Sequence, residues 1–188
     1  MRKVCEFIES IFEKVDSVLE SRFTENICYS ITNEEKNMAQ CTTGILDGVI
    51  TSGIEISEVQ KISAQKRFII EYLNELYDTN MEYLNEKTVL IFTVLHEIGH
   101  HVNAIKHTED YNNYRANCLR ETEEVNAMEC TSKERWLAYR QKTSEYNADK
   151  FAIEFMKEHY TEYLYPVELS LENLKEYFAT HMFEDLED

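Results

Sequence analysis

The sequence lacks the cysteine pattern of a disulfide-stapled or thiolate-bound protein. Its five cysteines are an odd number, and no two of them form a CxxC pair. A disulfide framework uses an even set and a zinc ribbon uses closely spaced thiolate pairs, so this sequence fits neither class. We expect reduced thiols in a cytoplasmic protein. The cysteines are Cys5, Cys28, Cys41, Cys118 and Cys130.

Basic charge is also scarce. The 19 lysines and arginines stand against 36 aspartates and glutamates, which gives a net charge of −17. Since like charge repels, neither nucleic acid nor an anionic membrane surface is expected as a partner. The acids are spread evenly, which points first to solubility and only second to a basic protein or peptide partner.

Long apolar runs are missing as well. No stretch approaches the length of a membrane span. Residues 1–20 carry acids throughout instead of the continuous apolar segment of a signal peptide. Hydrophobic residues nevertheless make up 43% of the chain, enough for a packed core. Because there is no repeat or linker, residues 1–188 are expected to form a single domain.

The N-terminal third predicts one helix and a small sheet. Apolar residues recur at helical spacing from Val4 to Leu19, which predicts an amphipathic helix ending near Arg22. Residues 26–32 alternate in the manner of a strand. The glycines and β-branched residues of 42–57 predict short strands joined by tight turns, with "GIEIS" (53–57) as the last strand.

The remainder is predicted to be helical. Helices are expected over 63–77, over 85–106, from a capping box at 131–134 into 144–160 with a break near Ser144, and over 170–183 after Pro166. The helix over 85–106 is apolar on nearly every side in its first half, which is typical of a buried helix. The predicted fold class is α+β, mostly helical, with a small antiparallel sheet in the N-terminal third.

The segment "HEIGH" (96–100) places two histidines four positions apart on that buried helix. Four residues span little more than one turn, so His96 and His100 project from one face and can bind a single Zn²⁺. Glu97 is directed beside the metal. From there it can take a proton from zinc-bound water, the role of the glutamate in HExxH.

The surroundings of the motif strengthen this interpretation. Burying two histidines and a glutamate without partners would cost several kcal/mol. Gly99 costs about 1 kcal/mol in a helix relative to alanine, which suggests that something approaches its backbone closely. The alternative is a pair of hydrogen-bonded core histidines. His101, the next residue, projects about 100° away and is expected to flank the site or to lie at the surface.

A third ligand must come from elsewhere, because catalytic zinc has three protein ligands plus water. A third histidine in HExxHxxGxxH is absent, since Asn103 and Lys106 occupy the glycine and histidine positions. "SEYNADKFAIEF" (144–155) offers Glu145 as the ligand. Asp149, four positions on, would accept a hydrogen bond from a ligand histidine. Glu123 and Glu124 remain rivals to Glu145.

"FTVLHEIGHH" (92–101) followed by "EYNADKFA" (145–152) resembles the gluzincin zinc metallopeptidases, both the ImmA/IrrE-type and the HtpX-like "ExxAD" peptidases. The resemblance implies His96, His100 and Glu145 as ligands, Glu97 as the general base, and Asp149 as the carboxylate that accepts a hydrogen bond from a ligand histidine. It also implies a peptide bound along the strand before the metal helix, for which residues 53–57 are the candidate. Asn147 replaces a second acid of the ImmA/IrrE pattern, and residues 101–144 form a long insertion.

The expected function is therefore a zinc-dependent metalloendopeptidase of gluzincin type. Its zinc-bound water is activated by Glu97, and its substrate is a protein or peptide, with a repressor-like regulator as one such substrate. The alternative is a non-proteolytic or degenerate zincin fold that serves as a zinc-stabilised regulatory protein-binding module. A peptidase also needs a donor for the oxyanion, and the candidates near the motifs are Tyr111, Tyr114, Tyr139 and Tyr146.

Overall fold

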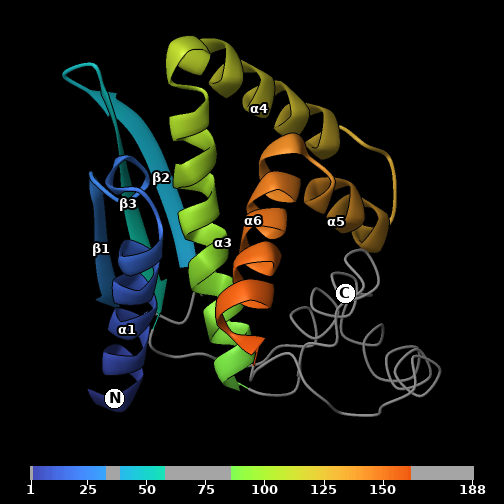
Figure 1. Ribbon diagram of the computed structural model, residues 1–188. Coiled ribbons are helices and arrows are strands. Elements are labelled where there is room, and N and C mark those ends of the chain that lie inside the picture. Colours follow the sequence, from blue (N-terminus) through green and yellow to red (C-terminus); the bar gives the residue numbers. More distant parts are fainter. Residues whose placement is uncertain (1, 33–38, 58–85, 162–188) are drawn as a thin grey trace, which may run out of the picture.

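The computed structural model describes residues 2–32, 39–57 and 86–161 and confirms the α+β class (Figure 1). In chain order the elements are α1 (Arg2–Val18), η1 (Ser21–Phe23), β1 (Ile27–Thr32), β2 (Ala39–Leu46), β3 (Val49–Ser57), α3 (Glu86–Lys106), η2 (Thr108–Asp110), α4 (Tyr111–Asn126), α5 (Ser132–Arg140) and α6 (Thr143–His159). The helices predicted over 63–77 and 170–183, together with Pro166, lie outside the described residues.

The sheet has three strands in the order β1-β3-β2. β2 and β3 form an antiparallel hairpin, whereas β1 pairs with β3 in parallel. The prediction of an antiparallel sheet was therefore right for the hairpin and wrong for β1. The hairpin turn is formed by Asp47 and Gly48, with φ angles of 52° and 81°. Two residues with positive φ are what a tight type I′ hairpin requires. Gly44 and Gly53 lie within strands instead of at turns.

One face of the sheet is covered. Along β3, Ile50, Ser52, Ile54 and Ile56 are buried, while Val49 and Gly53 between them are exposed, as the two-residue period of a strand dictates. β3 is the central strand, so the expectation that residues 53–57 form an edge was wrong. The strand beside α3 is β2, and among the described residues β2 pairs only with β3 (Figure 1).

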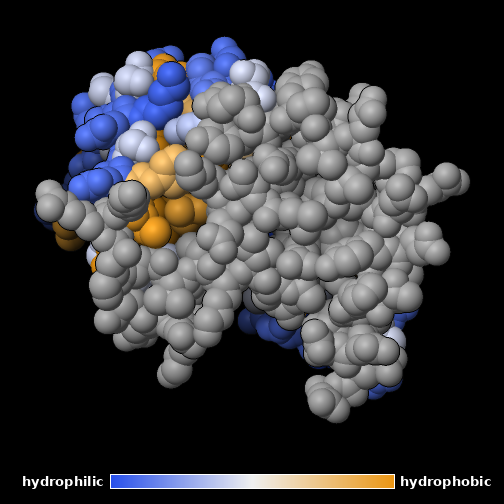
Figure 2. Space-filling model, turned by 90° about the horizontal axis from the view of Figure 1, so that it is seen from below, coloured by the Kyte–Doolittle hydropathy of each residue, from blue (hydrophilic) through white to orange (hydrophobic). Residues whose placement is uncertain are grey.

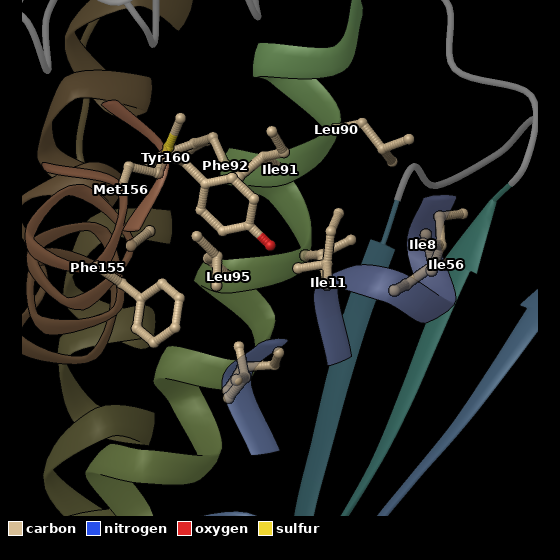
Figure 3. Close-up of a cluster of buried hydrophobic side chains, with 14 of the residues drawn as sticks. Ile8, Ile11, Ile56, Leu90, Ile91, Phe92, Leu95, Phe155, Met156 and Tyr160 are labelled. Atoms are coloured by element: carbon tan, nitrogen blue, oxygen red, sulfur yellow. The ribbon is translucent and has the colours of Figure 1, made fainter. Parts of the chain in front are cut away.

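Helix α3 is the centre of the molecule. It lies between the sheet and α6, which runs back alongside it (Figure 1). Its side chains from Leu90 to Val102 are buried with the exception of His100, as the apolar run predicted. The core fills the space between α1, α3, α6 and the sheet (Figure 3), and its largest fully buried members include Ile8, Ile11, Ile56, Ile91, Leu95 and Met156.

Gly99 allows α3 and α6 to approach closely. A Cβ atom at this position would lie 2.9 Å from both the Cα and the carbonyl oxygen of Ala148. The expectation that something approaches the Gly99 backbone is thus confirmed. The consequence is that the HEIGH turn of α3 faces the first turns of α6 at backbone contact.

Two local predictions have clear outcomes. The capping box is present: Thr131 accepts from the Glu134 backbone N–H, and the Glu134 carboxylate accepts from the Thr131 backbone N–H. Helix α1 ends at Val18, earlier than predicted, because the chain is extended at Glu20 before the short helix η1.

Within residues 2–32, 39–57 and 86–161, no helix combines the length and apolar character needed to cross a membrane. Seen from below, the surface of the described residues is mostly hydrophilic, with one compact hydrophobic patch (Figure 2). That surface agrees with the excess of acidic residues in the sequence.

Candidate metal centre

Helix α3 presents two imidazole rings to one point. The Nε2 atoms of His96 and His100 lie 3.1 Å apart, and the rings meet edge to face. His96 is buried, whereas the His100 side chain keeps 20% of its surface exposed. The point that the two rings share is therefore partly accessible to solvent on the His100 side.

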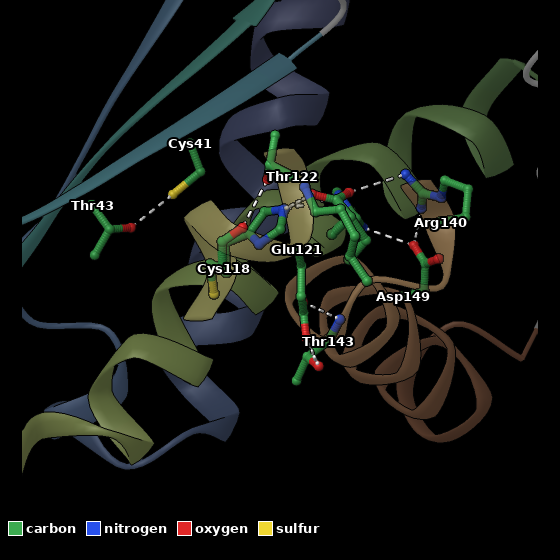
Figure 4. A network of polar contacts seen from close by, with 12 residues as sticks. Cys41, Thr43, Cys118, Glu121, Thr122, Arg140, Thr143 and Asp149 are labelled. Atoms are coloured by element: carbon green, nitrogen blue, oxygen red, sulfur yellow. Dashed lines mark hydrogen bonds and ion pairs between the residues drawn. The ribbon is translucent and has the colours of Figure 1, made fainter. Parts of the chain in front are cut away.

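Helix α6 contributes a carboxylate to the same point. Glu145 Oε2 lies 3.4 Å from His96 Nε2, and Glu145 Oε1 lies 3.7 Å from His100 Nε2. The start of α6 is fixed by Glu121 of α4, whose two carboxylate oxygens accept hydrogen bonds from the backbone N–H and hydroxyl of Thr143 (Figure 4). An acid in the first turn also suits the positive end of the helix dipole.

These three donor atoms fit a tetrahedral metal ion. Zinc bonds of about 2.0–2.1 Å at tetrahedral angles put neighbouring ligand atoms about 3.3 Å apart. The observed separations of 3.1, 3.4 and 3.7 Å bracket that value. Histidine, histidine and glutamate are also a donor set that catalytic zinc uses. In the part of the chain that the structure describes, this is the one such cluster.

Asp149 lies behind the first histidine. Its Oδ1 atom is 2.8 Å from His96 Nδ1, the ring nitrogen that faces away from the shared point. A carboxylate in this position holds the ring in the orientation that leaves Nε2 free for a metal. Asp149 is only 2% exposed, so the interaction is shielded from water.

Arg140, the last residue of α5, connects the two carboxylates of α6. Its guanidinium contacts Asp149 Oδ1 through Nη2 and lies 3.4 Å from Glu145 Oε2 through Nη1 (Figure 4). Arg140 is itself buried. Lys142 adds a second buried cation, with Nζ 4.0 Å from Glu145 Oε1. The positive charges of Arg140 and Lys142 therefore offset the negative charges of Glu145 and Asp149.

The electrostatics place one positive charge on the histidine pair. Burial and Arg140 would lower the pKa of His96, but Asp149 and Glu145 outweigh them and raise it to about 9. Burial and the neighbouring His96 lower the pKa of His100 to about 3. Burial would raise the pKa of Glu145, but His96, His100 and Arg140 lower it to about 2. The cluster thus holds a cation, which here is a proton.

Glu97 follows His96 on α3 and is within electrostatic range of residues on β2 and α5. It is 8% exposed, and its charge contributes to raising the pKa of both Cys41 on β2 and Tyr139 on α5. In each case burial is the larger cause. A carboxylate flanked in this way can accept a proton from a group held at the metal position.

The rival carboxylates lie elsewhere. Glu123 and Glu124 are exposed on α4, and Glu124 forms an ion pair with Arg120 at 3.9 Å. Of the three acids, only Glu145 is placed next to the histidines. Two of the candidate tyrosines differ clearly. Burial and the nearby Glu145 raise the pKa of Tyr139, whereas Tyr111 donates a hydrogen bond to the carbonyl of Thr43 at 3.0 Å.

His101 was expected at the surface, and that expectation was wrong. Its side chain is fully buried against the sheet, with Nδ1 2.7 Å from the hydroxyl of Ser52. Ser52 in turn lies 3.0 Å from the hydroxyl of Thr43 on β2. The covered face of the sheet reaches His101 because β2 and β3 pack against the side of α3 opposite α6.

Arg140 and Lys142 were not among the sequence candidates. The only signal for them was two basic residues just before the "SEYNAD" segment, and basic residues near a helix start are common on surfaces. Their importance follows from the packing of α5 against α6.

Comparison with protein-family models, with curated proteins and with solved structures gave no match.

Proposed function

We propose that this protein is a zinc metallopeptidase of gluzincin type that hydrolyses a peptide bond in a protein or peptide substrate. His96, His100 and Glu145 would hold the metal. The observation that supports this proposal most directly is that their donor atoms lie 3.1, 3.4 and 3.7 Å apart. These separations are close to the distance between neighbouring ligand atoms around a tetrahedral zinc ion. A purely structural metal would not need Glu97 beside it.

The residues around the ligands supply the remaining steps. When bound, Zn²⁺ supplies Lewis acidity at the scissile carbonyl and lowers the pKa of water at the site to about 7. Glu97 accepts the proton of the attacking water and passes it to the leaving amine. Asp149 keeps His96 in the orientation required of a ligand.

The placement of β2 supports an extended peptide as the substrate. β2 runs beside α3, Cys41 on this strand is near enough to Glu97 to feel its charge, and among the described residues only β3 pairs with it. A free strand edge can bind an extended peptide through backbone hydrogen bonds. A repressor-like regulator is one such substrate. We expect no nucleic-acid or membrane partner, since the net charge is −17.

A cytoplasmic location is part of the proposal. All five cysteines are free thiols, as expected of a protein in a reducing compartment.

The metal assignment is tested by the zinc content of purified protein. The wild type should carry about one zinc per chain, and His96→Ala and Glu145→Ala should lose it because a three-ligand site does not survive the loss of one donor. Glu123→Ala and Glu124→Ala are matched controls that should keep the metal. Zinc retained by Glu145→Ala but lost by either control would assign the third ligand to α4 and refute the proposed site.

The peptidase assignment is tested with Glu97→Gln, which keeps the shape of the side chain. This variant should bind zinc as the wild type does and should lose cleavage of a protein substrate. Full cleavage by Glu97→Gln would refute the role of Glu97. Zinc binding with no cleavage of any bound partner, and partner binding that survives zinc removal, would favour a regulatory binding module instead.

A further inference from the structure

Peptide hydrolysis creates a negative oxygen that needs a hydrogen-bond donor in addition to any metal. Tyr139 is the tyrosine nearest to that chemistry in the described part of the chain. It lies in the last turn of α5, and burial together with the nearby carboxylates of Glu145 and Glu97 raises the pKa of its hydroxyl. Its side chain is also 38% exposed, so a substrate can reach it.

The other described tyrosines near the site are used elsewhere. Tyr111 is buried and donates to the Thr43 carbonyl. Tyr114 stacks on His107 with ring centroids 4.5 Å apart. Tyr146 follows Glu145 on α6, so its side chain projects about 100° away from that of Glu145. Only Tyr139 combines a hydroxyl at the ligand cluster with access from solvent.

Tyr139 is not needed to hold Glu145 in place. The Glu145 carboxylate already has Arg140 at 3.4 Å and Lys142 at 4.0 Å. Both cations are buried and belong to the α5–α6 connection, so they fix the carboxylate without help from an exposed phenol. The hydroxyl of Tyr139 is therefore available for a different acceptor once a Glu145 oxygen is engaged as a ligand.

Lys142 also lies against the Tyr139 ring, with Nζ 4.0 Å from the ring centroid. A cation over the face of an aromatic ring is attracted to it and fixes its orientation. Lys142 Nζ is thus 4.0 Å from both the Tyr139 ring centroid and Glu145 Oε1, which places the ring beside the ligand cluster.

We propose that Tyr139 is the oxyanion donor of this site and that Lys142 is its positioning residue. This inference rests on the proposed function. In the reaction the Tyr139 hydroxyl turns from Glu145 to the carbonyl oxygen as that oxygen becomes negative, and it donates a hydrogen bond without losing its proton. The proton of the attacking water still goes to Glu97.

The test compares zinc-loaded wild type, Tyr139→Phe and the control Tyr146→Phe. Tyr146 is a suitable control because it is 39% exposed, almost the same as Tyr139. Inorganic phosphate serves as a tetrahedral anion probe, with its affinity measured by calorimetry. All three proteins should carry equal zinc. Phosphate should bind Tyr139→Phe about ten- to a hundredfold more weakly, the usual effect of losing a hydrogen bond to a charged group.

Kinetics on a cleaved peptide give a second readout. Tyr139→Phe should lower kcat about 10²- to 10³-fold with little change in KM, as when one oxyanion donor is removed. Lys142→Met should weaken phosphate binding in part, and Lys142→Arg should restore it because the cation over the ring is kept. A structural role for Lys142 alone would not be rescued in this way.

The outcomes separate this inference from the proposed function. Equal phosphate affinity in wild type and Tyr139→Phe, with or without a loss of zinc in the variant, would overturn Tyr139 as the donor and leave the peptidase proposal standing. No zinc in the wild type would refute the peptidase proposal and this inference together.

Discussion

Gly99 of α3 and Ala148 of α6 are in backbone contact: a Cβ atom at position 99 would lie 2.9 Å from the Ala148 Cα. The two residues stand in the middle of the ligand cluster. Gly99 immediately precedes His100, and Ala148 immediately precedes Asp149. The donors of α3 reach the carboxylates of α6 because glycine leaves room for the helices to touch.

Gly99→Ala should therefore lower the free energy of unfolding. Overpacking typically costs about 1–3 kcal/mol, whereas the better helix propensity of alanine returns only about 1 kcal/mol. We expect a net loss of up to about 2 kcal/mol in urea unfolding of the metal-free protein, together with weaker zinc binding. Gly53→Ala is the control, because a Cβ atom there meets nothing within 4 Å. Wild-type stability and zinc affinity in Gly99→Ala would show that the helices are not held together at this point.

Asp149→Asn should weaken zinc binding while leaving the ligands in place. The substitution keeps the size of the side chain but removes the negative charge that lies 2.8 Å from His96 Nδ1. Loss of such an orienting carboxylate typically costs about 10–100-fold in metal affinity. Competition with a chelator of known affinity measures the change. Glu154→Gln, an exposed substitution on the same helix, should bind zinc as the wild type does.

Much of the frame of this site follows from local sequence. The apolar run around HEIGH predicts a buried helix, and α3 is that helix. The spacing of His96 and His100 predicts rings on one face, and their Nε2 atoms are 3.1 Å apart. In the sequence Glu145 is followed at helical spacing by Ala148, Ala152 and Phe155, and these side chains are buried where α6 packs against α3. Periodicity carries this information because it describes one helix at a time.

What the sequence could not predict depends on contacts between elements. Arg140 ends α5 and Asp149 lies on α6, and the two helices are joined by a short connection. Helical periodicity therefore does not relate the two residues. His101 is buried because the sheet covers the side of α3 away from α6. The periodicity of one helix does not reveal whether a sheet or another helix packs on a given side of it. The alternation of apolar and polar residues predicts a strand but not its neighbours, so it could not predict that β1 pairs with β3 in parallel.

Arg140→Met should destabilise the metal-free protein more than the zinc-loaded protein. Removing Arg140 leaves Glu145 and Asp149 buried with less compensating charge, which typically costs about 3–5 kcal/mol. Bound Zn²⁺ would neutralise part of that charge, so zinc should raise the melting temperature of the variant by more than it raises that of the wild type.

Calorimetric scans with and without zinc measure this difference. Arg135→Met is the control, because Arg135 is exposed and its described hydrogen bond is to the Met128 carbonyl. An equal loss of stability in the zinc-loaded and metal-free forms of Arg140→Met would mean that Arg140 acts only through packing.

Zinc binding at neutral pH should release about one proton, since metal ligation requires an unprotonated ring nitrogen. Asp149 and Glu145 raise the pKa of His96 to about 9, so in the metal-free protein this ring is protonated at pH 7. His100, with its pKa lowered to about 3 by burial and His96, is already neutral, and Glu145 is already ionised. The proton released therefore comes from His96, and its release should fade as the pH rises above about 9.

Titration calorimetry in buffers of different ionisation enthalpy counts these protons. Asp149→Asn defines the source, because this variant keeps all three ligands. Asp149→Asn removes a carboxylate that raises the His96 pKa, so it should lower the pH at which release fades. The same number of released protons in wild type and Asp149→Asn at every pH would show that the proton does not come from His96, because the contribution of zinc-bound water is common to both proteins.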